Sequence, residues 1–104
     1  MFATIRRYEG VDKTRTNELV KQADETLKPM LSELPGFGSY YLIDTGNGVI
    51  TSVGFFDTPA HADESTKVAS GWVREHKFET VLPNAPKVTA GEVVSYEARE
   101  LIKA

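Results

Sequence analysis

The segment from Leu34 to Asp57 constrains the fold of this chain more than any other part. It has the pattern of a helix end, a strand, a tight turn, a second strand and a new helix start. Pro35-Gly36 is typical of a helix C-terminus, because Gly adopts the left-handed conformation that caps many helices. Thr45-Gly46-Asn47-Gly48 is typical of a hairpin turn, because Asn-Gly tolerates the positive φ angles that two-residue turns demand. The segment therefore predicts paired antiparallel strands at 37–44 and 49–56, lying between two helices.

The residues before this hairpin predict one strand and one amphipathic helix. Residues 2–8 alternate between two faces, as a strand does. Asp12 or Thr14 then offers a helix N-cap, and Pro29 predicts a kink within the helix. Apolar residues at spacings of mostly three and four form one stripe on this helix: Leu19, Ala23, Leu27, Met30, Leu31 and Leu34.

The residues after the hairpin predict a second helix and a fourth strand. Asp57-Thr58-Pro59 is a typical helix start, and Pro83 is a strong stop, so the helix is predicted at 59–80. Gly71 within it predicts close packing. The strand is predicted at 88–96, followed by a short helix or a frayed end at 97–104. The expected inward face of the helix consists of Ala62, Ala69, Trp72, Val73 and His76.

The resulting order, β-α-β-β-α-β, predicts one α+β domain over residues 1–104 with the ferredoxin-like split arrangement. In that arrangement a four-stranded antiparallel sheet carries both helices on one face. The predicted strands are apolar on both faces, and two helices cover only one of them. The uncovered face therefore predicts a partner, most simply a second copy of the chain around a two-fold axis.

Composition excludes several classes of function. The net charge is −3, whereas nucleic-acid binding usually needs a basic face. The chain has no Cys and no dense cluster of His, Asp and Glu, so neither a disulfide nor a built-in metal site is expected. It has no apolar run long enough to cross a bilayer and no signal-peptide pattern. We therefore expect a cytoplasmic protein that binds neither nucleic acid nor membrane.

Several short motifs resemble the dimeric α+β barrel superfamily, in its antibiotic-biosynthesis-monooxygenase-like branch. They are Leu27-Lys28-Pro29, Leu34-Pro35-Gly36-Phe37 and Tyr40-Tyr41; residues 3–10, 64–75 and 82–93 are similar to small bacterial proteins of unknown function in that branch. The resemblance covers nearly the whole chain and implies a homodimer whose two sheets form a barrel. The superfamily includes cofactor-free quinone-forming oxygenases, haem-degrading enzymes, dehydratases and proteins with no known activity, so the reaction stays open.

Arg6 is the best-placed residue for binding an anionic substrate. Its guanidinium group can form bidentate hydrogen bonds with a carboxylate or a phosphate. Thr4, Arg6 and Tyr8 alternate along the first strand and share one face, so Thr4 and Tyr8 are candidate ligand-binding residues beside it. The alternative for Arg6 is an ion pair with a carboxylate such as Glu92.

Trp72 and His76 lie four residues apart and share one face of the second helix. The haem-degrading members of the superfamily use a helix His as iron ligand, together with a Trp and an Asn on the first strand. This chain has Thr4 and Arg6 in that region and no Asn, so no haem or other cofactor is expected. The alternative is structural: Trp72 packs in the core, and His76 is a partly buried helix residue.

These residues predict a cofactor-independent monooxygenase acting on a small aromatic or quinone-like molecule. Arg6 would orient an anionic oxygen, His76 would take a proton, and Trp72 and Tyr8 would form the wall of the site. Tyr40, Tyr41 and Tyr96 are further candidates for hydrogen bonds to a phenolic substrate. The alternative function is a non-catalytic dimer that binds a small ligand or serves in a stress response.

Overall fold

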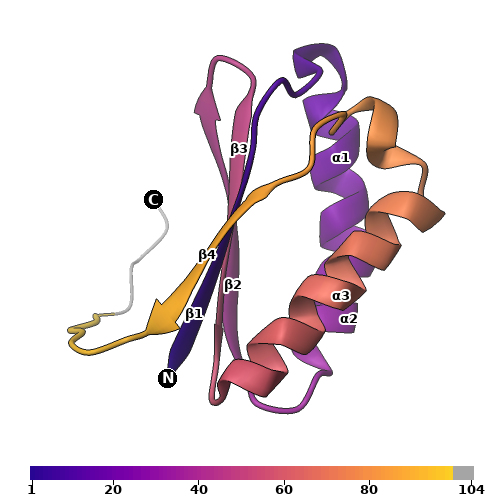
Figure 1. Cartoon of the computed structure of the whole chain (residues 1–104). Coiled ribbons are helices and arrows are strands. Elements are labelled where there is room, and N and C mark those ends of the chain that lie inside the picture. The colour runs from indigo at the N-terminus through magenta and orange to yellow at the C-terminus, as the bar shows by residue number, and fades with distance from the viewer. Residues whose placement is uncertain (100–104) are drawn as a thin grey trace.

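The structure is a computed structural model that describes residues 1–99 (Figure 1). It contains four strands: β1 (Phe2–Tyr8), β2 (Phe37–Gly46), β3 (Val49–Phe56) and β4 (Lys87–Glu92). The longest helix is α3 (Pro59–Glu75). The helical segment between β1 and β2 consists of a 3₁₀ turn η1 (Lys13–Arg15), α1 (Thr16–Gln22), a π-helical turn η2 (Ala23–Leu27) and α2 (Lys28–Ser32); a 3₁₀ turn η3 (Phe78–Thr80) follows α3.

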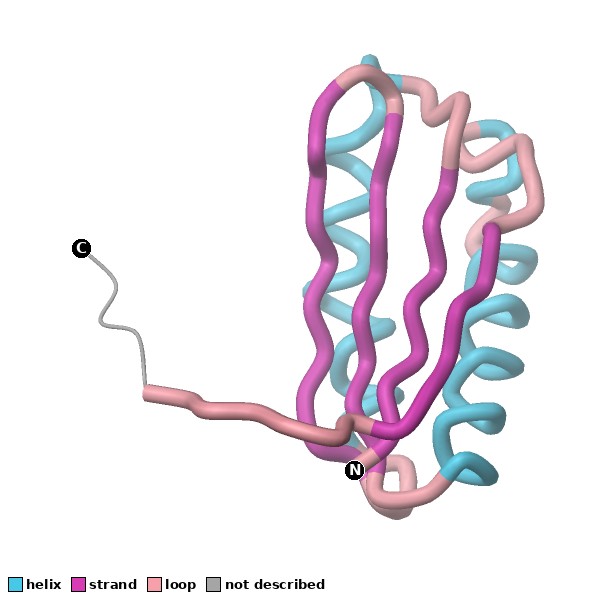
Figure 2. Tube along the Cα trace, turned by 60° about the vertical axis from the view of Figure 1, so that its left-hand side comes forward, coloured by secondary structure: helices cyan, strands magenta, loops and turns pink. Residues whose placement is uncertain are grey.

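The strands form one antiparallel sheet in the order β2-β3-β1-β4. Figure 2 shows the four strands side by side, with all helices behind one face. This is the ferredoxin-like α+β arrangement that the order of elements predicts. Because β1 lies in the centre of the sheet, its residues 2–7 have a partner on both sides. Arg6 lies opposite Ser52 in β3 and opposite Val88 in β4.

The core lies between the sheet and the helices. Alternate residues of β1 and β3 point toward the helices and are buried, among them Tyr8, Ile50 and Phe56. They meet an apolar helical face that includes Leu27 and Trp72. In the described part of the chain, no helix lies on the opposite face of the sheet (Figure 2).

The structure confirms the predicted strands 2–8 and 49–56 with the same bounds, and it extends the second strand to Gly46. Asn47 and Gly48 connect β2 and β3 with φ angles of 56° and 73°. These positive angles are the ones that Asn-Gly turns accept at small cost, so the hairpin forms where the sequence predicts it.

The predicted stripe on the first helix is wrong at Met30, which is exposed. The helix widens into the π turn at Ala23–Leu27 before Pro29 enters the first turn of α2. A π turn accommodates one extra residue, so it rotates the residues that follow it relative to a regular 3.6-residue repeat. Leu27 and Leu31 remain buried, whereas Met30 turns outward.

The second helix is shorter than predicted. It ends at Glu75, and Lys77 adopts a left-handed conformation with a φ of 58°. A left-handed residue ends many helices, but Gly or Asn usually occupies that position, so Lys77 gave no sequence signal. The close packing predicted at Gly71 is also wrong: a Cβ atom there would have no neighbour within 4 Å.

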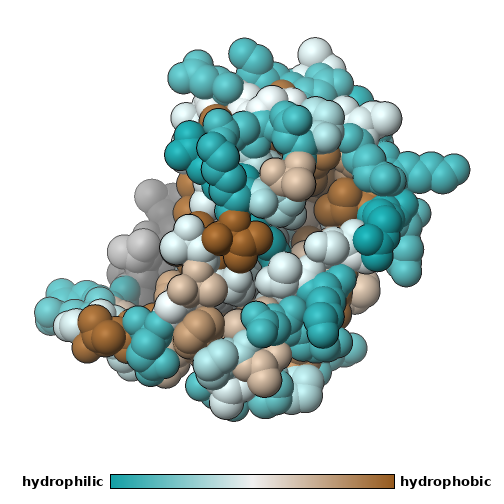
Figure 3. Space-filling view, viewed as in Figure 1, coloured by the Kyte–Doolittle hydropathy of each residue, from teal (hydrophilic) through white to brown (hydrophobic). Residues whose placement is uncertain are grey.

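The fourth strand is also shorter than predicted, because pairing ends at Glu92 rather than at residue 96. Residues 93–99 have no regular secondary structure, so 97–99 are not helical; the rest of the predicted tail, 100–104, lies outside the described residues. Figure 3 shows apolar residues, in brown and tan, over β4 and the chain that follows it. Within residues 1–99, the structure has no helix with the length and hydrophobicity that crossing a membrane requires.

Candidate functional site

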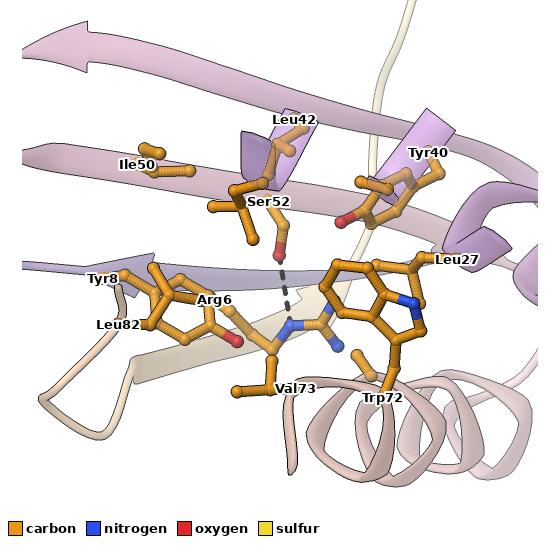
Figure 4. Close-up of a pocket in the computed structure, with 13 residues that line it drawn as sticks. Arg6, Tyr8, Leu27, Tyr40, Leu42, Ile50, Ser52, Trp72, Val73 and Leu82 are labelled. Atoms are coloured by element: carbon orange, nitrogen blue, oxygen red, sulfur yellow. Dashed lines mark hydrogen bonds between the residues drawn. The ribbon is translucent and has the colours of Figure 1, made fainter. Parts of the chain in front are cut away.

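A cavity lies in the core between the sheet and the helices (Figure 4). Most of its lining is apolar or aromatic, and Trp72 contributes from α3. Its polar groups come from three neighbouring strands: Arg6 and Tyr8 on β1, Tyr40 on β2 and Ser52 on β3. A mostly apolar cavity with a few convergent polar groups is the usual form of a small-molecule site.

Among residues 1–99, Arg6 is the only charged residue that lines this cavity, and its exposed fraction is 3%. Its Nε donates to Ser52 Oγ at 3.1 Å, and its Nη1 donates to Thr66 Oγ1 on α3 at 3.4 Å. Among residues 1–99, no carboxylate forms an ion pair with Arg6. The alternative partner Glu92 instead contacts the N-terminal ammonium group of Met1, at 3.4 Å. The guanidinium charge is therefore buried with hydroxyl partners alone.

Strand register explains how these polar groups come together. Arg6 and Ser52 are directly opposite each other in β1 and β3, so their side chains leave the sheet on the same face. Tyr8 is two residues further along β1 and shares that face. Tyr40 lies on the same face of β2, because it pairs with Gly54, two residues from Ser52.

The two phenol groups of the cavity remain protonated at neutral pH. Burial raises the pKa of Tyr8 and of Tyr40, and the neighbouring Arg6 guanidinium opposes this shift in both. A protonated phenol can donate a hydrogen bond to an anion. The cavity thus combines one cation with two neutral donors and no anion of its own.

The cavity is narrow in this conformation. The centre of a water molecule can move through about 30 Å³ of it, which is room for about two waters at roughly 10–15 Å³ each. Tyr8, Val73 and Leu82 line both this cavity and an open cleft on the outer side of the 82–86 loop. These three side chains therefore separate the cavity from the cleft.

Three of the five predicted site residues line this cavity: Arg6, Tyr8 and Trp72. Thr4 is buried on the same sheet face, opposite Gly54, but it does not line the cavity. His76 also lies outside the lining. Its ring packs against Trp72, with centroids 4.9 Å apart, and its Nδ1 is 3.1 Å from the Trp72 carbonyl oxygen.

The remaining candidates lie elsewhere. Tyr41 is 54% exposed on the open face of the sheet, and Tyr96 is exposed beyond β4. His61, a residue outside the predicted set, is near the start of α3, where its Nδ1 is 2.6 Å from Asp57 Oδ1. The hydrogen bond with His61 is the main reason why the pKa of Asp57 is lowered.

Sequence reasoning did not identify Ser52, Thr66 or Thr26 as parts of the site. Ser52 could have been found from the alternation of β3, because it occupies the buried phase between Ile50 and Phe56. Thr66 and Thr26 gave no comparable signal, since a single Thr on a helix usually hydrogen-bonds its own backbone.

No family model and no curated protein matches this chain. Solved structures do match it along nearly its whole length. A monooxygenase of Streptomyces coelicolor, in complex with the ligand nanaomycin D, is 17% identical, with 95% of this chain and 92% of that chain covered and a TM-score of 0.71. The haem-degrader MhuD of Mycobacterium tuberculosis, with two haems bound in its active site, is 18% identical over 94% of this chain and 100% of its own, with a TM-score of 0.70.

A third match is a dimeric ferredoxin-like protein from an uncultured marine organism. It is 17% identical, with 95% of this chain and 92% of that chain covered and a TM-score of 0.70. Likeness at such low identity establishes the fold and leaves the activity open. The chain has the ferredoxin-like fold of the antibiotic-biosynthesis-monooxygenase-like proteins, in agreement with its resemblance in sequence.

Proposed function

We propose that this protein binds a small aromatic anion, such as a phenolate or an ionised hydroxyquinone, in the Arg6 cavity and oxidises it with molecular oxygen. The observation that carries the proposal is the buried guanidinium of Arg6, which has no carboxylate partner among residues 1–99. A buried charge is stable only when it is paired and hydrogen-bonded. An anionic ligand would supply the missing charge.

The walls of the cavity favour an aromatic anion over a purely polar one. Trp72 and the apolar residues around it would contact the ring, and Arg6 would bind the ionised oxygen. Tyr8 and Tyr40 flank Arg6 as neutral donors and would bind a second oxygen on the ligand. A hydroxyquinone carries oxygens of both kinds on one plane.

The oxidation needs no external reductant. When a phenol reacts with O₂ to give a quinone, one oxygen atom becomes the new carbonyl and the other leaves as water. The protein would hold the ionised ring in a site that excludes bulk water. The similarity to a monooxygenase with a bound ligand supports this reaction class by fold alone. His76 lies behind Trp72, so the proton transfer predicted for it is not part of this proposal.

Binding is tested with 2-hydroxy-1,4-naphthoquinone, which is ionised at neutral pH, and with its uncharged methyl ether. Calorimetric titration should give the anion the higher affinity by about 10- to 100-fold, since a hydrogen bond to a charged group contributes roughly 1.5–3 kcal/mol. Arg6→Met should abolish the difference, whereas Lys67→Met should keep it, because Lys67 is exposed on α3 and does not line the cavity. Equal affinity of the wild type for both compounds would contradict the proposal.

Turnover is tested separately, by oxygen uptake with 1-naphthol, whose para position is free. A monooxygenase is supported if the wild type consumes oxygen faster than buffer alone and Arg6→Met does not. Selective binding of the anion without oxygen uptake supports the alternative, a non-catalytic ligand-binding protein. The two measurements therefore distinguish the binding function from the reaction.

The open face of the sheet supports a homodimer as the working form. No helix within residues 1–99 covers this face, which carries the side chains of Ile5, Tyr41, Val53 and Phe55. Burying apolar strands against a second copy is the simplest way to remove such a surface from water. Sedimentation at micromolar concentration should give about twice the 11.5 kDa of the chain. Val53→Lys should reduce this mass, and an exposed change on α3, Glu64→Lys, should not; a wild-type mass near 11.5 kDa would contradict the dimer.

A further inference from the structure

A chain of two hydrogen bonds connects the indole of Trp72 with the backbone of the first helical segment. The indole Nε1 donates to Thr26 Oγ1 at 2.7 Å. The same Thr26 hydroxyl donates to the carbonyl oxygen of Gln22 at 2.8 Å. Because its proton is committed to the carbonyl, the hydroxyl offers a lone pair to the indole, and both groups are satisfied.

Thr26 belongs to the π-helical turn η2, whose residues Ala23 and Leu27 line the cavity. Such turns are rare and occur frequently at functional sites. Here the turn serves two purposes at once. It presents two apolar side chains to the cavity and places a hydroxyl group where the indole N–H of α3 reaches it.

Two aromatic rings support Trp72 from one side. The centroids of His76 and Phe78 are 4.9 Å and 5.2 Å from that of the indole. They are only 6.3 Å from each other, so they cannot lie on opposite faces of Trp72. Trp72 also lines the cavity, whereas His76 and Phe78 do not. Figure 4 shows the indole nitrogen on the side of Leu27, away from Tyr8 and Ser52.

We infer that Thr26 is a positioning residue that holds Trp72 as a stacking surface for a planar anion bound to Arg6. With its N–H already donated to Thr26, the indole offers the ligand a ring surface and no hydrogen-bond donor. The ligand is then bound at two places, with its charge at Arg6 and its ring against Trp72. The inference rests on the proposed function for the ligand's charge. It adds that the ligand has a planar ring, because the ring would stack on the indole.

The test compares Thr26→Val, which removes the hydroxyl at nearly constant volume, with Thr26→Ser, which keeps it. Benzoate and cyclohexanecarboxylate serve as probes, because they carry the same charge on a planar and a non-planar ring. Wild type and Thr26→Ser should prefer benzoate by about 2- to 10-fold, the range expected for one aromatic contact. Thr26→Val should lose this preference while binding cyclohexanecarboxylate as the wild type does.

A second measurement needs no ligand and no variant. The chain contains one Trp, so a ¹⁵N-Trp spectrum gives a single indole N–H signal. In the wild type this proton should exchange slowly with solvent. Rapid exchange overturns the inference, and so does an unchanged benzoate preference in Thr26→Val. Failure of the proposed function would give a different result: the wild-type protein would bind the hydroxyquinone anion and its methyl ether with equal affinity.

Discussion

Replacing Arg6 by Met should stabilise the ligand-free protein. The guanidinium is 97% shielded from solvent by a lining that supplies hydroxyl groups and no carboxylate among residues 1–99. Removing an ion of this size from water costs several kcal/mol even after relaxation. Met fills a similar volume without that cost, so the cavity keeps its packing and loses its charge.

The hydrogen bonds lost in Arg6→Met offset part of this gain. The bond to Ser52 is 3.1 Å long and the bond to Thr66 is 3.4 Å. Thr66 keeps a second contact, to the carbonyl oxygen of Ala62, and Ser52 keeps a hydrogen bond with Tyr40, so neither hydroxyl is left without a partner. The net expectation is stabilisation by about 1–3 kcal/mol, near the range measured when buried charges are replaced by apolar groups. For a chain of this length, each kcal/mol raises the Tm by about 4–8 °C.

Urea unfolding at one fixed protein concentration measures this difference. The exposed control Lys67→Met on α3 should stay within about 0.5 kcal/mol of the wild type. At a ligand concentration of about 100 times its Kd the wild type should gain about 2.7 kcal/mol. The Arg6 variant, which binds about 10- to 100-fold more weakly, should gain only about 0.4–1.4 kcal/mol, so the stability difference narrows or reverses. Destabilisation of the ligand-free Arg6→Met protein by more than about 1 kcal/mol would refute the reasoning.

Three further predictions concern other residues. Gly71→Ala should raise the free energy of unfolding by about 0.5–1 kcal/mol, because the site in α3 is unobstructed and Ala restricts the unfolded chain; a loss of stability in urea would show that Gly71 has a contact. Leu82→Ala should speed ligand association in stopped-flow fluorescence of Trp72, because it thins the wall toward the outer cleft; an unchanged rate would place access elsewhere. Asp57 has a lowered pKa in the folded protein, so its contribution is present above the unfolded pKa of about 4 and is lost as the pH falls through the folded value. The stability difference between wild type and Asp57→Asn should therefore shrink in urea titrations from pH 6 to pH 3, and a constant difference would contradict this.

The strands could be predicted because their signals are local. Alternation marks β1 and β3, and Asn47-Gly48 fixes the hairpin between β2 and β3. The predictions fail at two positions where the backbone adopts a conformation that the residue types do not indicate. The π turn shifts Met30 out of the apolar stripe, and Lys77 ends α3 in a conformation for which its residue type gives no indication.

The candidate site was predictable in part for the same reason. Alternation along β1 places Arg6 and Tyr8 on one face, and the helical stripe turns Trp72 toward them. His76 shares that stripe, but α3 ends just before it, so its ring lies beside Trp72 rather than in the cavity. The contact between Trp72 and Thr26 depends on the distance between two helical segments, and no spacing in the sequence encodes that distance.

The central position of β1 has a consequence for the order of folding. The hairpin of β2 and β3 is local and can form within about 1–10 μs. β1 completes its pairing only with Lys87–Glu92, which the ribosome makes long after Arg6. Contacts so distant in sequence form slowly, because a large loop must close first. The partners of the Arg6 guanidinium, Ser52 and Thr66, are 46 and 60 residues away in the sequence, so burial of this charge also belongs to the slow, late part of folding.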